Sequence, residues 1–250
     1  MKHHEDSIIN MAAHYQADPD VIALFLIGSV ATGTEREDSD IDAVAVVSDE
    51  VFERKRAAGA TMEVVHGKCT YPGGYIDTHF SCPGQMRQLV ESGSEPMRNM
   101  FMAARPLFCK EDGLIELAAS IPRFPAAELE AKKLRYYCTM KQAYLYFWLM
   151  CKPQGYHRHH IANIMVFSLY RLILLENEVL FPSVRKLEEC VINATNKPEG
   201  IVQQCHEALA SLSDQAIAGL VETYERWTSY DYPKDRSVVI NNFKDPYEWQ

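Results

Sequence analysis

The stretch "LIGSVATGTEREDSDIDAVAVV", residues 26–47, decides the interpretation of this chain. Two aspartates, Asp40 and Asp42, lie one residue apart where an apolar run begins. Side chains in a strand alternate between the two faces of a sheet, so these two carboxylates project from the same face. Carboxylates this close repel each other, and a divalent cation removes the repulsion. The pair therefore predicts a metal site.

The turn before the aspartates favours phosphate binding. The apolar run 21–28 predicts a buried strand that ends at Gly28, and a short helix is expected to begin at Ser29. Free N–H groups at the start of a helix attract anions, and glycine lets a phosphate approach the backbone closely. One end of the sheet is thus predicted to offer both a phosphate-binding turn and metal-binding acids.

A third acid strengthens this prediction. Asp77 lies in "GYIDTHF", between the apolar Ile76 and Thr78. An acid in a strand is costly unless it is paired or bound to a metal. If the two strands are neighbours, the three carboxylates can hold up to two Mg²⁺ ions, as in sites that clamp the attacking and leaving oxygens of a phosphoryl displacement.

The pattern of the chain predicts two domains of different class. Short apolar runs predict an α+β first domain with a mixed sheet, over residues 1–122. Pro122 and Pro125 mark a boundary, and long helical periods then predict an all-α helical bundle over residues 126–250. The strands of the sheet are expected at 21–28, 40–48, 61–67, 75–82 and 104–109.

The second domain is expected to contain about five helices followed by a tail without clear periodicity. The tail, residues 231–250, contains two tyrosines and Trp249, which predicts that it packs on the body of the protein or on a partner.

The signature in the first half resembles that of the nucleotidyltransferase superfamily related to DNA polymerase beta. Gly28-Ser29, the spacing to Ser39 and the two acids, and the later strand acid all agree with it. The helical half is loosely similar to the substrate domain of aminoglycoside-type nucleotidyltransferases. The resemblance implies that the three aspartates are catalytic and bind metal. It also implies that Gly28, Ser29 and Ser39 bind the nucleotide.

Two positions depart from the relatives. Many small members of the superfamily carry arginine where Thr32 stands, before Gly33. Kanamycin-type enzymes use a glutamate on the first helix of the second domain as general base, whereas "CTMKQAY" offers Lys141 and Gln142 and no acid. Asp77 is therefore the residue expected to take the proton of the acceptor hydroxyl.

The resemblance implies an enzyme that moves a nucleoside monophosphate from a nucleoside triphosphate, with ATP the expected donor, to a hydroxyl group and releases pyrophosphate. The acceptor is expected to be a small molecule or a protein side chain. The alternative is a non-catalytic nucleotide sensor or interaction protein on the same fold. A homodimer is left open.

Other motifs in the chain fit their usual functions less well. "GSVATGTE" has the glycine spacing of a P-loop but Thr34 and Glu35 stand where lysine and Ser/Thr belong. The histidines of "GYHRHHIAN" lack further ligands at zinc spacing, so a solvated helix start is favoured. Lys186, in the first turns of a helix where the helix dipole disfavours cations, is a candidate nucleotide-binding residue.

Composition narrows the partners and the location. Asp and Glu outnumber Lys and Arg by 34 to 25, for a net charge of −9, which argues against a polynucleotide substrate and favours a cationic acceptor. The seven irregularly spaced cysteines predict no disulfide framework and a reducing cytoplasm. No apolar run has the length of a membrane span, so no membrane partner is expected.

Overall fold

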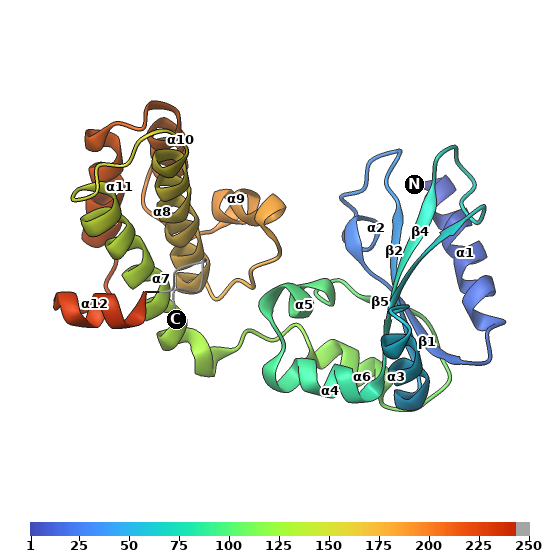
Figure 1. Cartoon of the computed structure of the whole chain (residues 1–250). Coiled ribbons are helices and arrows are strands. Elements are labelled where there is room, and N and C mark those ends of the chain that lie inside the picture. Colours follow the sequence, from blue (N-terminus) through green and yellow to red (C-terminus); the bar gives the residue numbers. More distant parts are fainter. Residues whose placement is uncertain (244–250) are drawn as a thin grey trace. The chain divides into compact units, whose positions relative to one another are not determined.

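The computed structural model describes residues 1–243, which form parts of two compact units, Met1–Arg123 and Phe124–Gln250. Each unit has its own secondary-structure class and core, as Figure 1 shows. Trp249 and the end of the predicted tail lie outside the described residues.

A five-stranded mixed sheet forms the centre of the first unit, which confirms the predicted fold class. The strand order is β3-β4-β2-β1-β5. β2 and β4 are parallel, and every other neighbouring pair is antiparallel. The strands are β1 (Val21–Leu26), β2 (Ile41–Val47), β3 (Met62–His66), β4 (Tyr75–Ser81) and β5 (Arg105–Cys109).

Helices cover both faces of this sheet, so β1 and β2 read as nearly continuous apolar runs. One core packs α1 and α3 against one face, and a second core packs α4, α5 and α6 against the other. Figure 1 shows α1 and the α4–α6 group on opposite sides of the strands. The helices are α1 (Lys2–Gln16), α2 (Gly28–Thr32), α3 (Asp49–Ala57), α4 (Pro83–Ser92), α5 (Glu95–Met100) and α6 (Leu114–Ser120).

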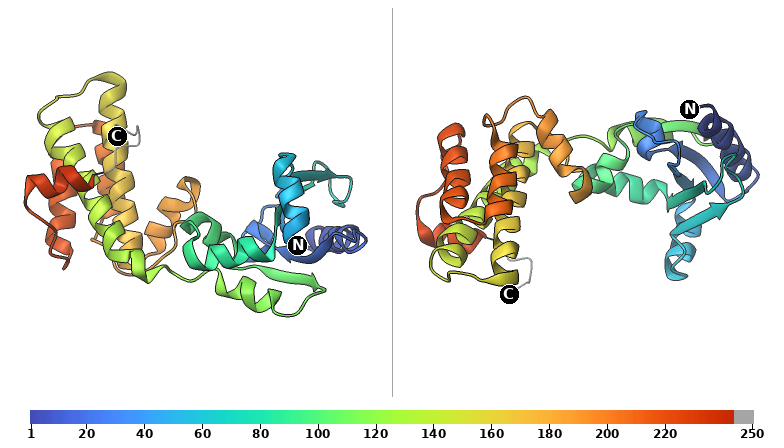
Figure 2. Two further views of the ribbon diagram at one scale, coloured as in Figure 1. Left: turned by 60° about the horizontal axis from the view of Figure 1, so that its bottom comes forward. Right: turned by 90° about the horizontal axis from the view of Figure 1, so that it is seen from above.

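The second unit is all-α, as predicted. Its core lies around the long helix α8, which runs alongside α7 (Figure 2). α7 continues without a break into a π-helical segment, η2, and a short 3₁₀ turn, η1, precedes it. The elements are η1 (Ala126–Glu128), α7 (Leu129–Gln142), η2 (Ala143–Trp148), α8 (Gly155–Glu176), α9 (Val184–Asn193), α10 (Ile201–Ser211), α11 (Asp214–Trp227) and α12 (Arg236–Asn242).

The helix α12 lies in the tail for which no regular element was expected. Asp235 caps it, since its carboxylate accepts a hydrogen bond from the Ser237 backbone N–H at 2.8 Å. Only Val239 of the helix is buried, so the seven residues carry too short an apolar period to be recognised in the sequence.

The seven cysteines are all free, in agreement with their irregular spacing. None of the helices within residues 1–243 is both long and apolar enough to cross a bilayer.

A buried arginine ties the end of the first unit to its α4–α5 corner. Arg98 is 3% exposed, and its guanidinium donates hydrogen bonds to the backbone carbonyl oxygens of Gly93, Val90 and Arg123 at 2.9, 3.1 and 3.2 Å. Backbone carbonyls buried without a donor are costly. The Arg98 side chain, from α5, therefore connects the C-terminal end of α4 with the last residue of the first unit.

We predict that Arg98→Met lowers the free energy of unfolding by about 3 kcal/mol, because each buried carbonyl that loses its donor costs about 1–3 kcal/mol. The control is Arg87→Met, which removes an exposed arginine 3.8 Å from Asp49 and should cost less than about 1 kcal/mol. Urea denaturation measures both. Equal losses in the two variants would contradict the role given to Arg98.

Candidate active site

The register of the parallel strands brings two of the predicted acids together. Asp42 of β2 and Asp77 of β4 are direct partners across the β2–β4 pair. Neighbouring strands lie about 4.8 Å apart and partnered residues point to the same face, so these carboxylates share one face of the sheet. That face is the one covered further along by α4, α5 and α6, because Val44 and Val46 belong to that core.

The third acid lies just before β2, and one tyrosine connects it with the other two. The hydroxyl of Tyr75 donates a hydrogen bond to the Asp40 carboxylate, which raises the pKa of Tyr75. The negative charges of Asp77 and Asp42 raise it further. The charges of all three carboxylates therefore act on the hydroxyl group of Tyr75.

One oxygen atom of the Asp77 carboxylate lacks a hydrogen-bond donor among the described residues. Its Oδ1 atom is buried and has no hydrogen-bond partner among residues 1–243. A buried carboxylate oxygen without a donor is unfavourable, and it is the kind of oxygen ligand that Mg²⁺ binds.

The three acids are not gathered into a finished ligand set. In the described part of the chain, no three His, Cys, Asp or Glu side chains are grouped so that they could hold a metal ion. Like charges on one face repel and separate unless a cation lies among them. Metal binding by Asp40, Asp42 and Asp77 thus stays a prediction, with the shared face and the unpartnered Oδ1 as its structural support.

Gly28 faces Asp42 so closely that a side chain at this position would have to displace the Asp42 carboxylate. Its φ is +70°, and a Cβ atom placed on it would overlap the carboxylate of Asp42 and lie 2.6 Å from Cγ. The backbone N–H of Ile27 also donates to the Asp42 carbonyl at 3.0 Å. The turn between β1 and α2 is therefore fitted against this one aspartate.

The remaining predicted residues lie in different surroundings. Ser29 is half-buried in α2, next to Gly28. Ser39 is buried in the loop before β2, where its Oγ accepts a hydrogen bond from the Arg36 backbone N–H at 2.9 Å and closes the loop. Lys186 lies in α9 of the second unit, and its Nζ pairs with Glu189 Oε2 at 3.0 Å. Nucleotide binding by these residues stays a prediction.

Two tyrosines near the acids were missed by sequence reasoning. Tyr75 occupies the strand position two residues before Asp77, and period-two alternation places it on the same face. Tyr71 donates a hydrogen bond to the Ser39 carbonyl and so secures the loop that carries Asp40. Strand alternation in the sequence could have indicated Tyr75. The role of Tyr71 depends on a contact between loops that no local sequence pattern indicates.

We predict that Gly28→Ala destabilises the protein much more than Gly33→Ala. Both glycines have a φ of +70° and flank α2, but a Cβ at Gly33 meets no described atom within 4 Å. Gly33→Ala should cost about 1–2 kcal/mol for the left-handed backbone. Gly28→Ala carries the same cost and must also displace the Asp42 carboxylate. Similar losses in urea denaturation would mean that the turn yields easily and that the fit is not required.

The comparisons with known proteins agree with this geometry. Residues 7–92 match the family described as Polymerase beta, Nucleotidyltransferase, a segment that spans α1 to α4 and includes all three acids. No curated protein sequence matches the chain.

Two solved structures are similar over most of the chain. A nucleotidyltransferase-like protein from Exiguobacterium sibiricum has 15% identity and a TM-score of 0.48, over 90% of this chain and 74% of that one. The spectinomycin adenyltransferase AAD(9) from Enterococcus faecialis, solved with ATP and spectinomycin, has 12% identity and a TM-score of 0.37, over 88% of this chain and 99% of that one. On the family match and its five-stranded sheet, the first unit contains a polymerase beta-like nucleotidyltransferase domain.

Proposed function

We propose that the chain is a metal-dependent nucleotidyltransferase that moves a nucleoside monophosphate from a nucleoside triphosphate to a hydroxyl group and releases pyrophosphate. The observation that carries this proposal is the Asp42–Asp77 pair, partnered across parallel strands and fitted against the Gly28 turn. ATP is the first donor to test. The acceptor is a small molecule or a protein side chain.

The two units have different roles in this proposal. Residues 1–122 form the nucleotidyltransferase domain, and residues 126–250 form a helical domain for substrate binding or assembly. The separate core of each unit supports the division.

The donor atoms fit a hard divalent cation. Three carboxylates near one hydroxyl, with one buried oxygen unpartnered within the described residues, suit Mg²⁺, which prefers oxygen ligands and shares them with substrate phosphates. Asp40, Asp42 and Asp77 would hold one or two such ions. The bound metal would offset the negative charge that develops during phosphoryl transfer.

The chain's own residues orient the reactants. The absence of a side chain at Gly28, next to Ser29, lets the Asp42 carboxylate lie directly against the turn, so a triphosphate bound there would lie beside Asp42, and Ser39 keeps the loop before Asp40 closed. The acceptor oxygen forms a bond to the α-phosphorus as the bond from that phosphorus to the pyrophosphate oxygen breaks. Asp77 is the carboxylate proposed to receive the hydroxyl proton, because "CTMKQAY" in α7 supplies no acid.

We predict that Mg²⁺ and ATP together raise the melting temperature, and that Asp40→Asn combined with Asp42→Asn removes most of the gain. A ligand that binds only the folded state stabilises it by mass action. Single Asp42→Asn or Asp77→Asn variants should lower transfer from radiolabelled ATP by about 100-fold or more, since metal-centred charge stabilisation contributes several kcal/mol. EDTA should abolish transfer in the unchanged protein.

Asp38→Asn is the matched control for these variants. Asp38 lies in the same loop, but it is exposed and pairs with Arg36 at 2.9 Å. Its loss should leave both readouts unchanged. An undiminished Mg²⁺–ATP shift in the double variant would refute the metal assignment, and binding without transfer to any acceptor would favour the non-catalytic sensor.

We predict that the acceptor is not a polynucleotide end. Binding a nucleic acid strand requires several clustered cations, whereas acids exceed bases by 34 to 25 in this chain. RNA binding should therefore be weak, and nucleotide addition to an RNA 3′ end absent, at low and at physiological salt. Tight, salt-sensitive binding with extension of the 3′ end would contradict this prediction.

A further inference from the structure

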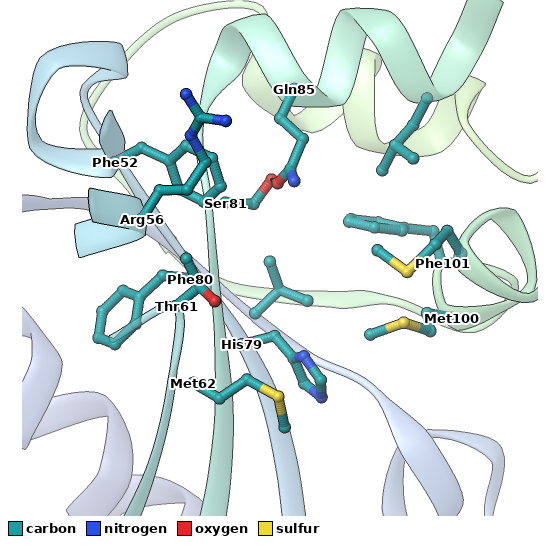
Figure 3. A pocket seen from close by; sticks show the side chains of 13 residues that line it. Phe52, Arg56, Thr61, Met62, His79, Phe80, Ser81, Gln85, Met100 and Phe101 are labelled. Carbon is teal, nitrogen blue, oxygen red and sulfur yellow. The ribbon is translucent and has the colours of Figure 1, made fainter. Parts of the chain in front are cut away.

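A cavity of about 280 Å³ lies in the first unit. It is bounded by strands β2, β3 and β4 and by helices α3, α4 and α5, as Figure 3 shows from close by. Its volume is just below the usual range for pockets that hold drug-sized ligands, which is about 300–1,000 Å³. The cavity therefore has room for one ring system.

The strand register places this cavity next to the acids. Val44 and His79 both line it, and they form the next same-face pair after Asp42 and Asp77. Two residues along a strand span roughly 6.6 Å. A ring that lies over the Val44–His79 pair can thus present a substituent at the Asp42–Asp77 pair.

The lining is mainly apolar. Met100, the last residue of α5, and the following Phe101 close one side of the cavity, and Met62 lies at its rim on β3 (Figure 3). Of the polar groups, the Ser81 hydroxyl donates to Gln85 Oε1 at 2.8 Å, so both already have a partner.

Charge in the lining disfavours a cation. None of the thirteen described residues that line the cavity is Asp or Glu, and Arg56 is a permanent positive charge at its edge. Arg56 pairs with Glu53 at 2.6 Å, and both side chains are exposed to solvent. The Glu53 carboxylate is therefore hydrated and already paired, and it does not serve as a partner for an ammonium group in the cavity. An amino-sugar would lose its hydration here without gaining a carboxylate.

We propose that this cavity is the acceptor subsite and that it takes an uncharged, largely apolar ring whose hydroxyl group points toward Asp77. This inference rests on the proposed nucleotidyl transfer. The hydroxyl oxygen of the ring forms the new bond to the α-phosphorus, pyrophosphate leaves with the electron pair of the broken bond, and the proton passes to the carboxylate proposed above.

The position of the Gly28 turn argues against the nucleobase as the occupant. The turn follows β1, on one side of β2, whereas the cavity extends over β4 and β3, on the other side. In-line displacement requires the attacking oxygen and the leaving pyrophosphate on opposite sides of the phosphorus. A triphosphate at Gly28 and an acceptor in the cavity meet that requirement, with the acids between them.

Ligand binding can be tested without any transfer reaction. NMR resonances of isotope-labelled methionine methyl groups would be followed while benzyl alcohol, cyclohexanol, glucosamine or ATP with Mg²⁺ is added to the full chain. We expect both ring alcohols to shift the resonances of Met62 and Met100, which line the cavity. Met102 is 59% exposed and does not line it, so its signal should stay in place. Glucosamine should shift none of the three.

Kinetics with cavity-filling variants test the acceptor role. Met100→Trp should raise the KM for a ring alcohol by about tenfold or more while the KM for ATP stays within about twofold, because only acceptor binding is lost. Met102→Trp adds the same bulk two residues away on an exposed side chain and should change neither constant. If Met100→Trp does not fold, Met62→Trp at the exposed rim of the cavity gives the same comparison.

Three results would overturn the proposal in distinguishable ways. Methyl shifts at Met62 and Met100 on addition of ATP, with a raised KM for ATP in Met100→Trp, would make the cavity the nucleobase site. Transfer to glucosamine without methyl shifts would leave the nucleotidyltransferase standing and remove the acceptor subsite. Methyl shifts with ring alcohols, but no transfer to any acceptor, would remove the proposed function and with it the acceptor role.

Discussion

The structure of the first unit depends on the parallel pairing of β2 with β4. Its register places Asp42 directly against Asp77, so two negative charges meet on one face of the sheet. The strands tolerate this because the rest of β2 is buried on both sides, and a shift by one residue would turn every apolar side chain to the wrong face. The core thus imposes the repulsion at the strand ends, and a cation is the ordinary way to relieve it.

The same register connects the charged site with the apolar cavity. Along β2 and β4, the Asp42–Asp77 pair is acidic, and the next pair on the same face, Val44 with His79, lines the cavity. β1 adds the third part, because its antiparallel pairing with β2 brings the Gly28 turn to Asp42. In the proposed arrangement, the phosphate, the reacting hydroxyl and the apolar ring therefore all lie along neighbouring strands of one sheet.

Sequence alone predicted the strands, the mixed sheet and the helical second half, because each follows from local periodicity. The shared face of Asp40 and Asp42 stays a prediction, because Asp40 precedes β2. The partner of Asp42 could not be predicted in the same way, since strand register is settled by packing between segments far apart in the chain. Tyr75 and His79 stand two residues before and after Asp77, so alternation placed them on the right face, but only the register shows what they face. Helix α12 was missed because its apolar period is too short.

The proposed neutral acceptor differs from the cationic acceptor that net charge favours. A formal charge of −9 favours cations near the protein in general, but exposed charges are screened within about 8–10 Å at physiological salt. An acceptor that lies against Val44 and Phe101 would be in contact with apolar groups. The hydrophobic effect acts only between surfaces in contact, because it depends on the apolar area removed from water. In the proposed arrangement, the lining of the cavity outweighs the distant acids in selecting the ring, while a metal held by the carboxylate pair would attract the triphosphate. That arrangement would let one acidic chain bind an anionic donor and a neutral acceptor on the same face of one sheet.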